Sequence, residues 1–172
     1  QLSVIAENLG MNVFYYDKEE RLALSNATKC KTLKELLSVS DVISLHVDGR
    51  ESNTNMIGEE EFKQMKKGVI FLNLSRGHIV DIKALKENIL SGKVAGCSID
   101  VFPHEPISNN EEFVSDLRGL RNTILTPHIG GSTSEAQENI GNFVPGKLMD
   151  YINTGSTSIS VNFPNLTLPI LE

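Results

Sequence analysis

The chain has 172 residues, 40% hydrophobic and 22% charged, so a soluble globular domain is expected rather than a disordered or membrane protein. Its 16 lysine and arginine residues against 22 aspartate and glutamate residues give a net charge of −6, which argues against a nucleic-acid surface. Cys30 and Cys97 lie far apart in sequence, so reduced thiols in a cytoplasmic protein are expected. No stretch resembles a signal peptide or reaches membrane-spanning length, so no membrane partner is expected.

Helix-period and strand-like stretches alternate along the first half of the chain. Apolar residues on one face predict a helix from Leu2 to Leu9, with Gly10 just past its end. The apolar stretches "NVFYYD" and "DVISLHV" predict strands. Between them, Thr32 and Glu35 have the spacing of a capping box and predict the start of a helix.

The alternation continues through the second half. A short helix is predicted in "EEEFKQMKKG", a strand in "GVIFLNL", a helix capped by Asp81, and strands in "VAGCSIDV" and "NTILTPHI". A long helix is predicted from about Ser132 to Ile152, with a bend near Val144 because Pro145 lies inside it. This order predicts parallel strands joined by helical crossovers, in an α/β sheet covered on both faces.

One strand is missing from this pattern. The chain begins inside a helix, although a crossover unit has a strand on each side. In a dinucleotide-binding unit, the acidic residue that ends the second strand lies about 20 residues after the first glycine of the phosphate loop. Counting back from Asp17 places that glycine upstream of Gln1. We therefore expect the sheet to lack its first strand and its glycine-rich loop.

The candidate functional residues follow the predicted strands. Ligands of open α/β sheets bind beyond the carboxyl ends of the strands. Asp17, Arg76 and His128 each follow a strand, and Glu105 lies in the segment "DVFPHEP". A guanidinium, a carboxylate and an imidazole on one rim fit the handling of a hydroxy acid.

Each candidate also has an ordinary structural interpretation. Arg76 alone fits a surface cation whose stem covers apolar neighbours, and Asp17 and Glu105 alone fit solvated carboxylates. His46, at a strand end, fits a packed core histidine equally well, and His128, between a proline and a glycine pair, fits a turn. The histidines show no helical spacing with an acid, so no metal site is predicted.

Three segments, in order, carry a family resemblance: "NLSRGHIVD", "SIDVFPHEP" and "LTPHIGGSTSEAQENI". They resemble the signature segments of the D-isomer-specific 2-hydroxyacid dehydrogenases. The segment "VNFPNLTLP" makes the resemblance closer to the members that oxidise 3-phospho-D-glycerate to 3-phosphohydroxypyruvate in serine biosynthesis. The resemblance implies a Rossmann-type doubly wound parallel sheet, NAD as cofactor and a 2-hydroxy acid as substrate. We also expect a homo-oligomer that assembles through the NAD-binding domain.

The resemblance also implies roles for the candidate residues. His128 would be the acid/base, Glu105 its hydrogen-bonded partner that stabilises the imidazolium, and Arg76 the clamp on the substrate carboxylate. Asp17 would bind the adenosine ribose and Asp100 would lie near the nicotinamide amide. The other residues expected along the cofactor are His46, Val47, Leu74, Ser75, Arg76, His128, Gly130 and Gly131.

The expected organisation is a partial NAD-binding domain over residues 1–152 and a tail over residues 153–172 that leads toward a substrate or regulatory domain. Without the phosphate loop, the chain alone is expected to be inactive. Two alternatives stay open. One is another D-2-hydroxyacid dehydrogenase, such as a glycerate or hydroxypyruvate reductase, and the other is a non-catalytic NAD-sensing module related to transcriptional corepressors.

Overall fold

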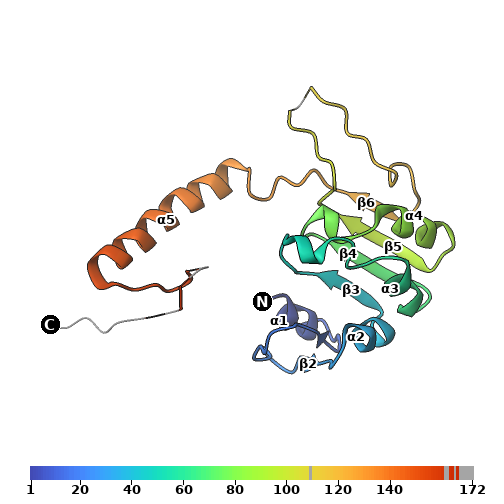
Figure 1. Cartoon of the computed structure of the whole chain (residues 1–172), viewed down its shortest axis with the longest axis horizontal. Coiled ribbons are helices and arrows are strands. Elements are labelled where there is room, and N and C mark those ends of the chain that lie inside the picture. The colour runs from blue at the N-terminus through green and yellow to red at the C-terminus, as the bar shows by residue number, and fades with distance from the viewer. Residues whose placement is uncertain (109, 161–162, 165, 167–172) are drawn as a thin grey trace. The chain divides into compact units, whose positions relative to one another are not determined.

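The computed structural model describes residues 1–108, 110–160, 163–164 and 166 (Figure 1). The chain forms two compact units, Gln1–Pro127 and His128–Glu172. All β-strands of the described residues belong to the first unit, and the second contains helix α5 (Ser134–Thr154). None of the helices in the described part of the chain is long and apolar enough to cross a membrane.

A four-stranded sheet forms the centre of the first unit. Its strand order is β3-β4-β5-β6, and every pairing is parallel, as the sequence predicts. The strands are Val42–Leu45, Val69–Asn73, Val94–Ile99 and Thr123–Leu125. Because the strands are parallel, their carboxyl ends lie at one edge of the sheet.

A second, separate sheet holds β1 (Phe14–Tyr15) and β2 (Thr28–Lys29), which pair in parallel. Strand β1 lies inside the predicted "NVFYYD" strand but is shorter. Strand β2 was not predicted, because it consists of two exposed residues with no apolar alternation to mark them. Within the described residues, β1 pairs only with β2 and β3 pairs only with β4.

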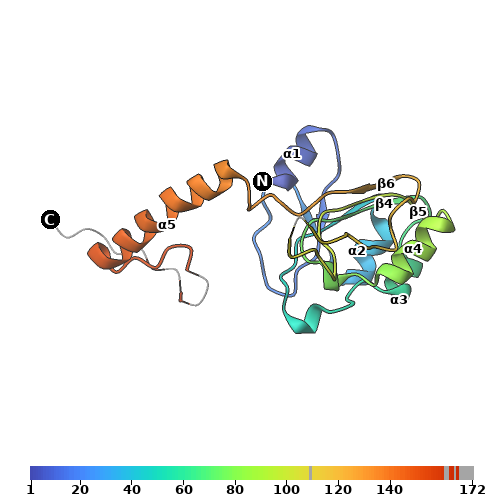
Figure 2. The same cartoon turned by 90° about the horizontal axis from the view of Figure 1, so that it is seen from above.

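Helices α2 (Leu33–Val39), α3 (Glu59–Gln64) and α4 (Ile82–Leu90) lie on the same face of the four-stranded sheet (Figure 2). The Thr32 hydroxyl caps α2 by accepting a hydrogen bond from the Glu35 backbone N–H at 3.1 Å. Asp81 Oδ1 caps α4 by accepting from two backbone N–H groups, at 2.9 and 3.2 Å. Both predicted helix starts are confirmed.

Helix α1 (Leu2–Asn8) precedes these helices and ends two residues before Gly10, which has a φ of +83°. Positive φ is a conformation that glycine adopts at no steric cost, and it turns the chain out of the helix toward β1. The predicted first helix and its end are therefore confirmed.

The two faces of the four-stranded sheet differ in burial. Side chains on one face, among them Leu45, Phe71 and Ile99, are buried against the helices. On the other face, Val42, Ile70 and Ile124 remain 46%, 37% and 63% exposed. The expected covering of both faces is therefore not found within the first unit, because α2, α3 and α4 all pack on the same side.

The second unit begins at His128 and contains α5, which the Thr133 hydroxyl caps by accepting from the Ala136 N–H at 3.1 Å. The helix continues through Pro145 without ending and stops at Gly155, whose φ is +68°. The predicted long helix is confirmed with a shift of two residues. The bend near Val144 stays a prediction.

Two segments of the first unit meet backbone to backbone. Gly77 begins the short 3-10 helix η2 (Gly77–Ile79) that follows β4, and Phe102 follows β5. A Cβ atom on Gly77 would lie 2.0 Å from the carbonyl carbon of Phe102 and 2.2 Å from its oxygen. The Phe102 ring in turn packs edge-on against Phe113, with centroids 4.6 Å apart. Only glycine fits at position 77 unless the backbone moves.

The substitution Gly77→Ala should therefore destabilise the protein by about 3 kcal/mol, because the added methyl group would force two backbone segments apart. Thermal unfolding of the full-length protein measures this effect. Gly141→Ala in α5 is the matched control, since a Cβ atom there meets nothing within 4 Å. Alanine in a helix should be neutral or stabilise by about 0.5–1 kcal/mol. Equal melting temperatures for the Gly77 variant and the wild type would contradict the proposed clash.

Candidate active site

The carboxyl end of β4 continues into a turn held by a buried amide. Asn73 is fully buried, and its Oδ1 accepts hydrogen bonds from the Ser75 N–H at 3.1 Å and the Ser75 hydroxyl at 2.8 Å. Its Nδ2 donates to the Arg76 carbonyl at 3.0 Å. Leu74, between these residues, is 54% exposed at the rim. Sequence analysis missed Asn73, although a polar residue at the end of an apolar strand was the available signal.

The Arg76 side chain extends from this turn along the loop that follows β3. Its Nη1 donates to the Ser75 carbonyl at 2.6 Å. The stem lies next to Gly49, where an added Cβ atom would be 3.1 Å from the Arg76 Cγ. The predicted clamp residue therefore sits between the loops that follow β3 and β4.

Asp100 lies at the end of β5 and is held from two sides. Its backbone N–H donates to the Asn73 carbonyl at 3.0 Å, and its carboxylate accepts a hydrogen bond from the Thr126 hydroxyl. The Thr126 N–H donates to the Ile99 carbonyl at 3.0 Å. The ends of β4, β5 and β6 are thus connected through Asp100. Thr126 was not among the predicted residues.

Glu105 lies four residues beyond Val101 in an exposed loop. Its Oε1 accepts a hydrogen bond from the Phe102 backbone N–H at 2.9 Å. Since Phe102 also contacts Gly77, the structure brings the Glu105 loop beside the Arg76 turn. These two predicted catalytic residues therefore belong to adjoining segments.

His46 lies at the end of β3 and is exposed, with its Nε2 2.9 Å from the Ser44 hydroxyl. The interpretation as a packed core histidine is therefore wrong. Val47 is half-buried, and the loop continues into Asp48, whose carboxylate accepts from Arg50 Nε at 2.8 Å. The Arg50 guanidinium lowers the pKa of the Asp48 carboxyl group, chiefly by this hydrogen bonding.

Asp17 follows β1 and keeps 42% of its side chain exposed. Its Oδ1 accepts from the Glu19 N–H at 2.9 Å, and its Oδ2 lies 3.6 Å from Arg21 Nε. The carboxylate is therefore oriented by its own turn while one edge stays open to solvent.

His128 belongs to the second unit and has a φ of +52°. Left-handed backbone is uncommon for a residue with a side chain, although histidine adopts it more often than most. The turn continues with a bond from the Ser132 N–H to the Ile129 carbonyl at 2.9 Å, and Gln137 Nε2 donates to the Gly131 carbonyl at 2.6 Å. Gly130 is exposed. Because Arg76 and Glu105 lie in the other unit, their grouping with His128 stays a prediction.

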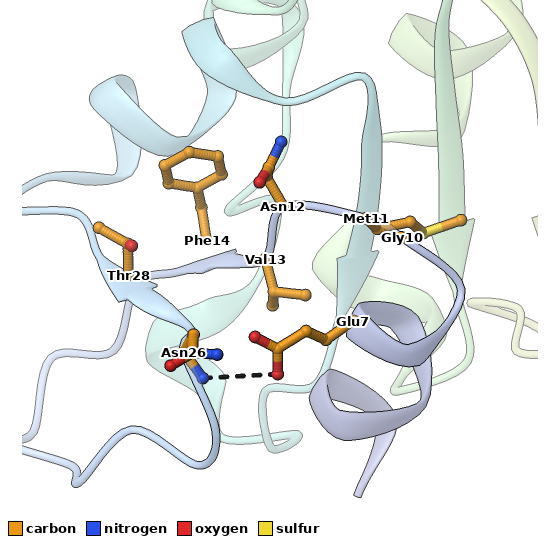
Figure 3. Close-up of a pocket in the computed structure, with 8 residues that line it drawn as sticks. All are labelled: Glu7, Gly10, Met11, Asn12, Val13, Phe14, Asn26 and Thr28. Carbon is orange, nitrogen blue, oxygen red and sulfur yellow. Dashed lines mark hydrogen bonds between the residues drawn. The ribbon is translucent and has the colours of Figure 1, made fainter.

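A cavity of about 340 Å³ lies at the opposite end of β1, where the chain enters that strand (Figure 3). Glu7, Val13, Phe14 and Asn26 are among its lining residues. Hydrogen bonds from Ser25 and Asn26 lower the pKa of the Glu7 carboxyl group. None of the predicted site residues lines this cavity.

No group of three or more potential metal ligands occurs among the described residues. Both cysteines are free and buried, and burial raises the pKa of the Cys97 thiol. Neither thiol is therefore set up as a nucleophile.

Residues 1–130 match the family described as D-isomer specific 2-hydroxyacid dehydrogenase, NAD binding domain. The chain belongs to this family. The matched residues include both parallel sheets and extend beyond β6, so the sheets described above belong to the NAD-binding domain of this family.

The chain is similar to family members called D-3-phosphoglycerate dehydrogenase. It is 54% identical to the protein from Haemophilus influenzae over 98% of this chain and 41% of that protein. It is 52% identical to the Escherichia coli K12 protein over 99% of this chain and 42% of that protein. The chain therefore spans about two-fifths of the length of these relatives.

Solved structures of 2-hydroxyacid dehydrogenases have the same fold. The Aquifex aeolicus D-lactate dehydrogenase, solved with NAD and lactic acid, is 33% identical, with a TM-score of 0.74 over 88% of this chain and 49% of that one. A D-2-hydroxyisocaproate dehydrogenase is 33% identical, with a TM-score of 0.76 over 90% of this chain and 50% of that one. The parallel α/β architecture is thus that of the family's NAD-binding domain.

The strand ends of this 2-hydroxyacid dehydrogenase domain fit NAD in their chemistry. The partly open carboxylate of Asp17 can accept hydrogen bonds from a ribose diol. The Asp100 carboxylate, fixed by Thr126, can accept from a carboxamide. The exposed segments around His46 and Leu74 lie at neighbouring strand ends, where a planar ring can approach the backbone.

We predict that the full-length protein prefers NAD to NADP, because the Asp17 carboxylate would repel a 2′-phosphate. Asp17→Ala should lower kcat/KM for NAD by roughly tenfold or more, the usual effect of losing a hydrogen bond to a charged group. The ratio of kcat/KM for NAD to kcat/KM for NADP should fall as well. Steady-state kinetics with both cofactors measure this. Asp41→Ala is the matched control, since Asp41 is an exposed carboxylate at the amino end of β3 paired with Lys66 at 2.9 Å. Equal efficiency of the wild type with NADP would refute the assignment.

Proposed function

We propose that this chain is part of a D-3-phosphoglycerate dehydrogenase, which oxidises 3-phospho-D-glycerate to 3-phosphohydroxypyruvate with NAD. The observation that carries the proposal is the 54% and 52% identity to proteins of that name over nearly all of this chain. Oxidation of a secondary alcohol removes a hydride and a proton. NAD, when bound, accepts the hydride.

The proton is assigned to His128. A ring nitrogen of its imidazole can accept the hydroxyl proton during oxidation and return it during reduction. Its position three residues after the end of β6 supports the assignment, because ligands of open α/β sheets bind beyond the carboxyl ends of the strands. Glu105 is proposed to stabilise the imidazolium once the proton has been accepted.

Arg76 is proposed to hold the substrate carboxylate. A guanidinium is planar and can donate two parallel hydrogen bonds to the two oxygens of a carboxylate. The position of Arg76 between the loops after β3 and β4 supports this role, since the carboxyl ends of parallel strands are where ligands of such sheets bind.

For the complete protein we propose a Rossmann-type doubly wound sheet in which one further parallel strand lies between β1 and β3. Both sheets are parallel, which supports this arrangement. Within the described residues β1 pairs only with β2 and β3 pairs only with β4, so each has a second edge where a further strand can pair. A glycine-rich loop would follow that strand. Residues 1–152 would then belong to the NAD-binding domain and residues 153–172 to a tail toward the substrate or regulatory domain. Assembly into a homo-oligomer through this domain, in the cytoplasm, is part of the same proposal.

The proposed activity is tested with the full-length protein, NAD and three substrates: 3-phosphoglycerate, glycerate and lactate. A kcat/KM for 3-phosphoglycerate well above the other two is expected. A higher kcat/KM for glycerate would instead indicate a glycerate or hydroxypyruvate reductase. NAD binding without turnover of any hydroxy acid would indicate a cofactor-sensing module.

His128→Ala in the full-length enzyme should reduce kcat by at least about a hundredfold and leave the Kd for NAD nearly unchanged, because general acid–base catalysis contributes roughly 10²–10⁴. His104→Ala replaces another exposed histidine and serves as the control. Stopped-flow turnover and NAD titration measure the two quantities. If the His128→Ala enzyme kept a near-normal kcat, His128 would not be the acid/base and would have only a structural role in its turn.

Within the described residues, β1 and β3 are each paired along one edge only, and this leads to a prediction about folding. The 172 residues expressed alone should self-associate or stay partly unfolded and bind NAD poorly, because unpaired strand edges attract other chains. Adding the preceding segment of the full-length protein as a separate fragment should restore a cooperative unfolding transition. Size-exclusion chromatography and calorimetry test this. The prediction would be wrong if the 172 residues alone formed a monodisperse monomer that binds NAD with micromolar affinity.

A further inference from the structure

A fully buried amide side chain lies directly beneath the proposed carboxylate clamp. Asn73 closes β4 with 0% exposure, in a strand whose other buried residues are apolar. Both ends of its amide group are used. Oδ1 receives the N–H and the hydroxyl of Ser75, and Nδ2 donates to the carbonyl of Arg76.

We propose that Asn73 is a positioning residue, which fixes the backbone of Arg76 so that the guanidinium meets the substrate carboxylate in one orientation. The inference rests on the proposed function, since it needs Arg76 to bind a carboxylate. No part of the Asn73 side chain reaches solvent, so it acts through Arg76 and does not touch the substrate itself.

The chemistry of this position requires an amide. The site presents two donors, from Ser75, and one acceptor, the Arg76 carbonyl. A carboxylate would accept from Ser75 but has no hydrogen to donate to that carbonyl, and an alkyl side chain would satisfy neither. In a buried, low-dielectric position each unmade bond is costly, so the turn is held in one conformation.

The amide itself is anchored by the sheet. Asn73 pairs with Ile99 in the ladder between β4 and β5, and its carbonyl accepts from the Asp100 N–H at 3.0 Å. The backbone of Asn73 therefore cannot follow the turn if the turn moves. Arg76 is positioned relative to β5, where Asp100 lies, rather than relative to a free loop.

The Arg76 stem is restrained separately, on its other side. An added Cβ atom at Gly49 would lie 3.1 Å from the Arg76 Cγ and 3.5 Å from its Cδ. Asn73 thus fixes where the Arg76 main chain lies, and the loop at Gly49 limits where its side chain can go. A flexible four-bond side chain loses much of its freedom before substrate arrives, which lowers the entropy that binding must remove.

The test uses Asn73→Ala in the full-length enzyme. We expect KM for 3-phosphoglycerate to rise and kcat/KM to fall about tenfold, the effect of one lost buried hydrogen-bond partner, while the Kd for NAD stays within about threefold of wild type. Asn88→Ala is the matched control, because Asn88 Nδ2 also donates to a backbone carbonyl, that of Ala84 at 2.8 Å, within α4. The control should leave both constants unchanged.

A double-mutant cycle separates positioning from general stability. If Asn73 acts through Arg76, adding Asn73→Ala to an Arg76→Lys enzyme should cost less than about threefold further in kcat/KM, because residues in one network are not additive. A tenfold further loss in that background would overturn the proposal, as would a single variant with wild-type kcat/KM. If Asn73→Ala does not fold, Ser75→Ala replaces it, since it removes only the hydroxyl bond to Oδ1. The same KM-dominated loss, about threefold, is then expected, and an unchanged KM would count against the proposal.

Calorimetric titration of oxalate into the NAD-saturated protein provides a readout without turnover. Asn73→Ala should weaken oxalate binding about tenfold relative to Asn88→Ala, because it removes the three hydrogen bonds that hold the Arg76 turn. If the wild type oxidises no hydroxy acid but this difference is found, the proposed function fails and the positioning role stands. If the wild type is active and oxalate binds equally to both variants, the positioning role fails alone.

Discussion

The backbone contact between Gly77 and Phe102 determines the geometry of the first unit at the rim of the sheet. With 2.0 Å between a hypothetical Gly77 Cβ and the Phe102 carbonyl carbon, the segments after β4 and β5 pack without any intervening side chain. Arg76 precedes this contact directly, and Glu105 bonds to the N–H of Phe102. The backbone segments that carry these two proposed catalytic residues are therefore held next to each other by main-chain packing, which tolerates less variation than contacts between side chains.

The rim is also connected by hydrogen bonds that run across the strands. Asn73 joins the turn after β4 to the end of β5, and Thr126 joins the end of β6 to Asp100. The bond to the turn and the bond from Thr126 use short polar side chains, and the bond between Asn73 and Asp100 joins two backbone groups. They give the rim rigidity beneath Arg76, the residue proposed to hold the substrate carboxylate.

Much of this fold was readable from the sequence, because apolar runs and caps are local signals. The strands β3 to β6 and the caps Thr32 and Asp81 lie where the pattern predicts them. Strand β2 has no such signal, since its two residues are exposed and it exists only through its pairing with β1. The open face of the sheet was also unpredictable, because strands rich in apolar residues look alike whether one face or both are covered.

The candidate site was predictable in part for a related reason. Residues at strand ends can be found by counting along the chain, and Arg76, Asp100 and His46 lie at such ends. The roles of Asn73 and Thr126 depend on which strands become neighbours, which no single segment encodes. Likewise, the left-handed backbone of His128 depends on the turn it occupies, and the residue type alone does not predict it, although histidine adopts this conformation more often than most residues.

The strand order of the main sheet has a consequence for how the protein is made. In β3-β4-β5-β6, every strand pairs with the one that precedes it in the chain, so spatial order and chain order coincide. Each crossover can therefore dock onto an existing edge as it leaves the ribosome, and no strand has to wait for a distant partner to be synthesised. Loop closure stays short at every step, which favours rapid formation. Strand β3 is the exception, because within the described residues its other edge has no partner, and the further strand proposed for that edge belongs to the preceding segment, which is synthesised earlier.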